Sequence, residues 1–432
     1  MKVLTNFRNL LRCCSLRGQL FGWDKRISHG HELRIWRTVV PLLLLLCGLV
    51  GRSDAQLTIL HNFGDGSAPD DGWSPEGGVI QGSDGNFYGT TYENATVFQM
   101  TPSGTVTTLY AFTFGTYGPA SDLLEYGGNL IGTTELGGIV GGQAGSYGTV
   151  FATPLSGTTT FWHEFKDGSV PDDGFAPYGS LILGSDGFLY GTTKLGGAHN
   201  KGTIYKIDPT DQKLTIVHSF RAGNGEPWAG LLLAKDGNYY GTTTASLKTA
   251  NAFGGIFKMT PSGKVSFLYT FTTSSAAGYL AYAGLIQASD GNFYGVATSG
   301  GKYDGGTVFK MTPDHAVTVL HNFGNKKDGD GPFGGLAQGP DGALYGTTVN
   351  GGTTKKTSVI GVDAINPRGY GIVFRITTAG AYKVLHNFGD GSVPNDGELP
   401  YAPLTVGSDG FLYGTTTLGG TAGHGTVFKI TP

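Results

Sequence analysis

The chain has 432 residues and a mass of 45.2 kDa, and 75 of its residues are glycine. Glycine at this density without a Gly-X-Y period excludes collagen, while 39% hydrophobic and 12% aromatic content excludes a disordered chain. The composition therefore indicates a folded, turn-rich protein with enough apolar material for a core.

The first 55 residues differ in composition from the rest. Eight Lys and Arg residues precede the apolar run at 39–51, and the small residues Ser53 and Ala55 follow it. This order is typical of a secretory signal cleaved after Ala55. We therefore predict that 1–55 is a signal peptide with a long basic leader, and that the protein is secreted, periplasmic or at the cell surface. An uncleaved membrane anchor is the alternative, although a membrane span needs about 20 apolar residues.

Without this leader the charge balance becomes acidic. Residues 56–432 contain no cysteine and hold 20 basic against 29 acidic residues, a net charge of −9, and three of the basic residues are Arg. Such a surface disfavours phosphate backbones and anionic lipid. We expect a monomer with no nucleic acid partner and, after signal cleavage, no integral membrane domain.

Four short patterns recur seven times each in 56–432. The first is an aromatic residue followed by Gly-Thr-Thr, usually after Asp-Gly, as in DGNFYGTT from Asp84. The second reads like GTVFKMTP from Gly306, the third like VTVLHNF from Val317, and the fourth like AGLIQAS before Asp290. Each pattern is rich in β-branched and aromatic residues and is bounded by Gly, Pro or Asp, so each predicts a strand.

The number and order of these patterns predict the fold. Seven units of four strands predict an all-β, seven-bladed β-propeller with four-stranded blades. Residues 57–63 carry an unaccompanied third pattern, and 425–432 carry an unaccompanied second pattern. We therefore expect the N-terminal and C-terminal strands to pair and close the ring at 56–432. The alternative is an open solenoid, which would need capping repeats.

The patterns SDGNFYGTT, GTVFKMTP and VTVLHNF resemble the tandem repeat of the choice-of-anchor GloVer (Gloeo/Verruco) proteins over nearly all of 56–432. They are more distantly similar to NHL-type propeller repeats. The resemblance implies a bacterial, exported repeat protein, and it brings no assigned reaction and no catalytic residues.

Acidic loops connect the third pattern to the fourth. DGSAPDDGW from Asp65, DGSVPDDGF from Asp167 and DGSVPNDGE from Asp390 share one spacing. Carboxylates with loop carbonyls could bind Ca²⁺, carboxylates beside exposed rings could hold a sugar, and the same residues are common turn formers. The candidate calcium ligands are Asp65, Asp71, Asp167, Asp173, Asp390 and Asp396, and no other cofactor is expected.

Aromatic residues recur near the start of the expected inner strands, at Trp73, Phe175, Tyr178, Trp228, Tyr282, Phe333 and Tyr401. Equivalent positions on inner strands converge on the axis, so some of these rings are expected to line one pocket. Packing between blades is the alternative. Trp73 and Trp228 are the preferred stacking residues. The predicted ligand-binding residues are Trp73, Asp70, Asp71, Asp172, Asp173, Phe175, Trp228, Asp396 and Tyr401.

Histidine recurs at one position of the third pattern, at His61, His218, His321 and His386, with His163 a near match. Equivalent residues on outermost strands lie far apart, so we expect a structural role and no metal site.

Motifs of common enzymes are missing from the sequence, which contains no H-E-x-x-H, C-x-x-C or G-x-S-x-G. We expect no catalytic residue and an exported propeller that binds a glycan or protein ligand through loops on one face. One alternative is an extracellular polysaccharide hydrolase or lyase that uses the loop carboxylates. The other is a structural or adhesive component of the cell envelope.

Overall fold

The structure is a computed structural model that describes residues 56–112, 118–140, 143–144, 147–156, 158–244, 253–325, 327–353 and 369–432. Internal contacts divide the chain into Met1–Asp54 and Ala55–Pro432. The predicted signal peptide at 1–55 lies outside the described residues. Within the described residues the regular elements are all strands. No helix long and apolar enough to cross a membrane is found among these residues.

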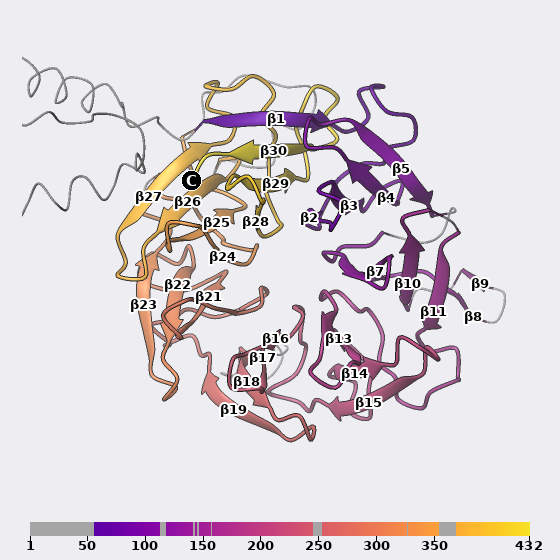
Figure 1. The fold of residues 1–432 in the computed structure, drawn as a ribbon. Coiled ribbons are helices and arrows are strands. Elements are labelled where there is room, and N and C mark those ends of the chain that lie inside the picture. The colour runs from indigo at the N-terminus through magenta and orange to yellow at the C-terminus, as the bar shows by residue number, and fades with distance from the viewer. Residues whose placement is uncertain are drawn as a thin grey trace, which may run out of the picture. The chain divides into compact units, whose positions relative to one another are not determined.

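Seven four-stranded antiparallel sheets are arranged in a ring (Figure 1), which confirms the predicted seven-bladed propeller. In each blade the strand nearest the axis is the shortest. The first blade contains β2 (Ile80–Gln81), β3 (Phe87–Thr91), β4 (Thr96–Met100) and β5 (Val106–Ala111). The second contains β6 (Leu124–Tyr126), β7 (Asn129–Thr134), β10 (Thr149–Pro154) and β11 (Thr160–Glu164), and the ribbon of β8 (Ile139–Val140) and β9 (Gln143–Ala144) lies between β7 and β10 in the chain.

The next four blades repeat this plan. The third contains β12 (Ile182–Leu183), β13 (Leu189–Thr193), β14 (Thr203–Ile207) and β15 (Leu214–Ser219). The fourth contains β16 (Leu232–Leu233), β17 (Tyr239–Thr243), β18 (Gly255–Met259) and β19 (Val265–Thr270). The fifth contains β20 (Ile286–Gln287), β21 (Phe293–Ala297), β22 (Thr307–Met311) and β23 (Val317–Asn322). The sixth contains β24 (Ala337–Gln338), β25 (Leu344–Thr348), β26 (Ile372–Ile376) and β27 (Tyr382–Asn387).

The seventh blade joins the two ends of the propeller. It contains β28 (Thr405–Val406), β29 (Leu412–Thr416), β30 (Thr426–Ile430) and, as its outermost strand, β1 (Leu57–Asn62). β1 pairs with β30 from Leu57 opposite Ile430 to Asn62 opposite Thr426. The predicted closure of the ring by N-terminal and C-terminal strands is therefore confirmed. The outer edge of β30 is paired with β1 and is not left open.

The recurring Gly of the Gly-Thr-Thr pattern makes room for an aromatic ring. In β17, Gly241 lies opposite Phe257 of β18. A Cβ atom on Gly241 would lie 2.5 Å from the Phe257 ring, which is closer than real side chains pack. The aromatic residue of the second pattern thus lies across the neighbouring strand, and the buried aromatic residues fill the space between successive blades.

Candidate ligand-binding site

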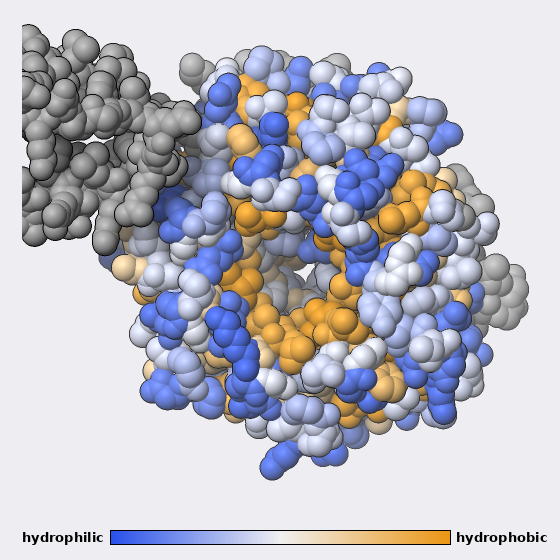
Figure 2. Space-filling view, in the orientation of Figure 1, coloured by the Kyte–Doolittle hydropathy of each residue, from blue (hydrophilic) through white to orange (hydrophobic). Residues whose placement is uncertain are grey.

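A cavity of about 370 Å³ lies in the middle of the ring and is lined by residues from all seven blades. In the space-filling view the centre of the ring is hollowed, and hydrophobic residues surround the hollow (Figure 2). The cavity walls come from the short inner strands and from the segments that lead into them. Ligand pockets of propeller-like folds are expected at such a place, because equivalent residues of every blade converge there.

Seven residues at one equivalent position, four residues before the inner strands β2, β6, β12, β16, β20, β24 and β28, form what we call the axial ring. Its members are Glu76, Ala120, Tyr178, Trp228, Tyr282, Phe333 and Tyr401. Five of the seven are aromatic, and they come from five consecutive blades. The single carboxylate and the single alanine come from the first two blades, so the axial ring is asymmetric although the fold is repetitive.

The five aromatic residues form a continuous arc of ring contacts. The ring centroids of Tyr178 and Trp228 are 5.3 Å apart, and those of Trp228 and Tyr282 are 4.9 Å apart. Tyr282 and Phe333 are stacked at 4.7 Å, and the Phe333 and Tyr401 centroids are 5.2 Å apart. All five side chains are partly exposed. The arc therefore offers aromatic surface to the cavity while each ring is held by its neighbours.

Glu76 closes the gap that the arc leaves. Its carboxylate accepts a hydrogen bond from the Tyr178 hydroxyl at 3.0 Å, although Ala120 of the intervening blade lies between them in the order of the axial ring. Burial is the main reason why the pKa of Glu76 is raised, and the nearby carboxylates of Glu135 and Glu93 raise it further. A carboxyl group whose ionised form is disfavoured by its surroundings thus lies at the edge of an aromatic surface.

A second carboxyl group, that of Asp122, also lines the cavity. Its Oδ1 accepts a hydrogen bond from the backbone N–H of Gly78 at 2.6 Å, and its own backbone N–H donates to Ser180 at 3.1 Å. Burial raises the pKa of Asp122. The equivalent positions of the other six blades carry Gly78, Ser180, Gly230, Gly284, Gly335 and Pro403, so Asp122 is the charged member of this second level.

Threonine hydroxyls hold the axial ring in place. Thr192, Thr242 and Thr347 donate to the backbone carbonyls of Ala229, Ala283 and Ala402 in the following blade. These carbonyls belong to the residues directly after Trp228, Tyr282 and Tyr401. Thr415 likewise donates to the carbonyl of Gly77, directly after Glu76, at 3.0 Å. At these four positions the first Thr of the Gly-Thr-Thr pattern therefore helps to position the ring residue of the next blade.

A cation lies on one face of Trp228. The ammonium group of Lys194 is 3.5 Å from the centroid of the indole, and it also lies 3.7 Å from a carboxylate oxygen of Glu135. Nε1 of Trp228 is buried and has no hydrogen-bond partner among the described residues. Trp228 is therefore polarised by a positive charge and retains an unused donor.

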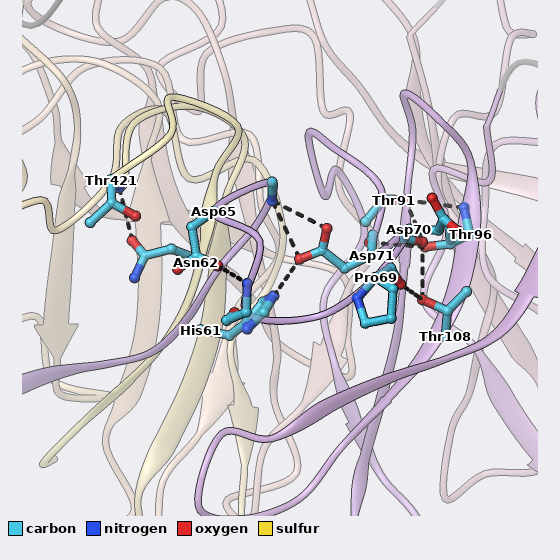
Figure 3. Close-up of polar contacts among 12 residues, drawn as sticks. His61, Asn62, Asp65, Pro69, Asp70, Asp71, Thr91, Thr96, Thr108 and Thr421 are labelled. Carbon is cyan, nitrogen blue, oxygen red and sulfur yellow. Dashed lines mark hydrogen bonds and ion pairs between the residues drawn. The ribbon is translucent and has the colours of Figure 1, made fainter.

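The acidic loops form clamps with the outer strands, as Figure 3 shows for the loop after β1. Asp71 is 3% exposed, its Oδ2 lies 2.7 Å from Nε2 of His61, and both of its oxygens accept from the backbone N–H of Gly64. Asp173 is paired with His163 at 3.0 Å, and Asp396 with His386 at 2.6 Å. The structure thus brings each of these three predicted ligand-binding residues to a histidine of the strand that precedes its loop.

The fourth histidine pair is incomplete. Nε2 of His321 lies 3.2 Å from Oδ2 of Asp328, but this nitrogen has no hydrogen-bond partner of good geometry among the described residues. The loop after β23 is the shorter relative of the three acidic loops, which explains the poorer alignment. Burial lowers the pKa of His321, while the charge of Asp328 raises it less strongly. Among the described residues His218 has no carboxylate partner of this kind, and burial lowers its pKa.

The remaining predicted ligand-binding residues lie in different surroundings. Tyr401 and Trp228 belong to the axial ring. Trp73 is 36% exposed and stacks on His424, with ring centroids 4.1 Å apart. The ring of Phe175 packs edge-on against Tyr147, with ring centroids 5.7 Å apart. Asp70 and Asp172 are exposed in the acidic loops, where the Asp70 carbonyl accepts a hydrogen bond from Thr108. The structure does not bring these four residues into the axial cavity.

The candidate calcium ligands are engaged within their own loops. Asp65, Asp167 and Asp390 each accept a hydrogen bond from the backbone N–H two residues later. Among the described residues no group of three His, Cys, Asp or Glu side chains gathers closely enough to hold a metal ion. Calcium binding by these loops stays a prediction.

Sequence reasoning missed Glu76 and Asp122, and it missed the pairing of the loop aspartates with the histidines. A signal for the pairing was present, because His61, His163 and His386 each precede an Asp by ten residues. The strands with Tyr110 or Tyr269 at the histidine position lead into loops without that Asp. For Glu76 and Asp122 the signal was a departure from the residues that the other repeats carry.

Solved structures of low sequence identity share this fold. A streptogramin B lyase is 17% identical with a TM-score of 0.58, and the match covers 87% of this chain and 97% of the lyase. Virginiamycin B lyase from Staphylococcus aureus is 15% identical with a TM-score of 0.58, covering 88% and 99%. The extracellular domain of a putative hybrid two-component system from B. thetaiotaomicron is 13% identical with a TM-score of 0.55, covering 86% and 39%.

No curated protein matches the chain. The repeat patterns themselves are diagnostic, since they match the Gloeobacter/Verrucomicrobia repeat over residues 50–251 and 222–366, more than half of the sequence. The chain therefore belongs to the Gloeobacter/Verrucomicrobia repeat family.

Proposed function

We propose that the protein binds a glycan in the axial cavity and that the aromatic arc of the axial ring is the binding surface. The observation that carries this proposal is the arc itself, five partly exposed rings from Tyr178 to Tyr401 that contact one another around one cavity. A sugar ring has apolar C–H faces and a polar hydroxyl edge. It matches a pocket with mainly apolar walls and a few polar groups.

Polar groups at the cavity wall support the same ligand class. Glu76 and Asp122 supply carboxylate acceptors at the cavity wall. Sugar hydroxyls can donate to these carboxylates. A purely apolar ligand would cover the remaining acceptor sites of these carboxylates without giving them a hydrogen bond, which costs about 1–3 kcal/mol for each buried group.

The test compares two tryptophans. Binding of the full chain to a panel of immobilised polysaccharides is measured together with Trp228→Ala and Trp73→Ala. We expect the loss of one stacking ring in Trp228→Ala to weaken glycan binding at least about tenfold, which corresponds to about 1.4 kcal/mol. Trp73→Ala is the matched control, because this exposed ring lies outside the cavity. Loss of binding in Trp73→Ala alone would place the ligand on the outer loops and overturn the axial site.

Glycan cleavage is a second candidate function, favoured by the two carboxyl groups in one cavity. Burial raises the pKa of both Glu76 and Asp122, and a carboxyl group with a raised pKa is suited to donate a proton to a leaving group. Release of reducing ends from the bound polysaccharide is the measurement. If cleavage occurs, Glu76→Gln and Asp122→Asn should each abolish it. Binding without cleavage would contradict this second function and agree with binding alone.

We further propose that the protein meets its ligand outside the cytoplasm. The basic and apolar composition of 1–55 supports export. Cell fractionation with an antibody against the propeller, together with N-terminal sequencing of the exported form, tests this, and a protein retained in the cytoplasm with its first residues intact would contradict it.

A further inference from the structure

We propose that the axial cavity selects sugars that carry a protonated amino group, such as oligomers of glucosamine, over neutral and acidic sugars. This inference rests on the proposed glycan function and specifies the ligand class. It follows from two features that lie together in the cavity, a wall whose charged side chains are all acidic and an aromatic surface that attracts cations.

The charged residues of the cavity wall have one sign. Glu76 and Asp122 line the cavity, and no Lys, Arg or His does so among the described residues. The two groups belong to adjacent blades, where Asp122 is joined to Gly78, two residues after Glu76. Glu135 and Glu93 add negative potential at Glu76. An acidic sugar would have to place its carboxylate beside these groups without a cation to compensate, which makes its binding unfavourable.

The basic group beside Trp228 is already engaged. Lys194 contacts the face of Trp228 and lies 3.7 Å from Glu135, and among the described residues no hydrogen bond or ion pair joins it to Glu76 or Asp122. Lys194 also demonstrates that the Trp228 indole accepts a cation at 3.5 Å from its centroid. The same electrostatic attraction acts on a ligand ammonium group at the aromatic surface of the cavity.

The polar contacts of Glu76 leave capacity for such a ligand. The Tyr178 hydroxyl donates to Oε2 of Glu76 at 3.0 Å, and a carboxylate has about four acceptor sites on its two oxygens. An ammonium group carries three donors. A sugar amine beside Glu76 could form a charge-assisted hydrogen bond while the sugar ring contacts the arc. An acetylated amine has no charge and keeps a single N–H donor, so it would lose this contribution.

The experiment uses the full chain and four soluble hexasaccharides at low ionic strength, made of glucosamine, N-acetylglucosamine, glucose and galacturonic acid, with calorimetric binding. We expect the glucosamine oligomer to bind about tenfold more tightly than the acetylated and neutral oligomers, and the acidic oligomer most weakly. Glu76→Gln, which keeps an acceptor for Tyr178, should remove this preference without weakening the acetylated oligomer. Asp211→Asn, which also removes one negative charge, is the matched control, because Asp211 is exposed and outside the cavity wall.

The outcomes separate this inference from the proposed function. Equal binding of the glucosamine, acetylated and neutral oligomers, all lost in Trp228→Ala, overturns the charge selection and leaves the glycan site intact. No binding of any oligomer by a folded protein overturns both. Glucosamine binding that Trp228→Ala and Glu76→Gln leave unchanged, or that hexalysine reproduces with the same affinity, shows attraction to the acidic surface and also overturns the selection.

Discussion

Asp70 and Asp71 are neighbours in the chain with opposite surroundings. Asp70 is exposed, whereas the carboxylate of Asp71 is buried between His61 and the backbone N–H of Gly64. In Asp71→Asn the amide NH₂ must face one of these groups in place of an acceptor. We expect this change to lower the free energy of unfolding by about 1–3 kcal/mol. Chemical denaturation of the two variants measures it.

Asp70→Asn is the matched control for that experiment. Asn tolerates the left-handed backbone of residue 70, whose φ is 50°. Its side chain has no hydrogen bond to lose among the described residues, so we expect a change within about 0.5 kcal/mol. Equal stability of the two variants would contradict the view that the His–Asp pairs clamp the loops.

Glu76 makes stability depend on pH. Burial, aided by Glu135 and Glu93, raises its pKa above the value in the unfolded chain. Between the two pKa values the folded state binds more protons than the unfolded state, so this group lowers stability as pH rises through that window. We expect Glu76→Gln to match the natural protein below about pH 4, where Glu76 is protonated in both states, and to exceed its stability at pH 7. Thermal unfolding from pH 4 to 7 measures the difference, and a variant that is less stable at pH 7 contradicts this reasoning.

For single residues, the sequence predicted where side chains lie in the fold better than it predicted their hydrogen-bond partners. The recurrence of aromatic residues before the inner strands was enough to expect rings near the axis, because the repeat fixes which residues are equivalent. The roles of Asp71, Asp173 and Asp396 did not follow, since their residue type also suits turns and ligand sites. The three-dimensional path of each loop returns its last Asp to the preceding strand. This path determines that the Asp pairs with a histidine.

Among the elements, the second strand of each blade depends on its glycine. Gly241 faces Phe257, and a methyl group at Gly241 would overlap the aromatic ring. We expect Gly241→Ala to destabilise the protein by about 1–3 kcal/mol through overpacking. The measurement is a double-mutant cycle with Phe257→Leu.

The smaller leucine should relieve the overlap. The cost of Gly241→Ala should therefore be lower by at least about 0.5 kcal/mol in the Phe257→Leu background than in the natural protein. Additive effects of the two changes would show that the glycine serves the backbone and not the ring.

Strands were predictable because their patterns repeat. Any one pattern, such as VTVLHNF, is too short to distinguish a strand from a buried helical segment. Seven copies at similar spacing, each bounded by turn residues, removed that ambiguity. The inner strands were the hardest elements to delimit, since β2, β12 and β28 contain two residues each. Their backbone pairing is limited by the convergence of the blades on the axis.

For the molecule as a whole, the pairing of β1 with β30 determines whether the ring stays closed. Thr58 lies opposite Lys429 in this pair. We expect a Thr58→Cys, Lys429→Cys variant, with Cys13, Cys14 and Cys47 changed to Ser, to form a disulfide under oxidising conditions. Linking residues this far apart in sequence should stabilise the protein by about 3–5 kcal/mol. Denaturation with and without reductant measures the gain.

The single-cysteine variants are the controls for that cross-link. They should show no dependence on reductant within the monomer. A double variant that stays reduced, or forms only disulfides between molecules, would contradict the register of β1 and β30.

The asymmetry of the axial ring has a consequence for how such proteins diversify. Seven nearly interchangeable scaffolding units each contribute one side chain to a shared opening, and at four of these positions a Thr hydroxyl of the preceding unit bonds the backbone beside the contributed side chain. A substitution at one position of the axial ring can therefore change the chemistry of the opening without changing the fold. Shuffling of whole units by recombination would generate new combinations of aromatic, acidic and small residues, so the axial ring acts as a combinatorial specificity code.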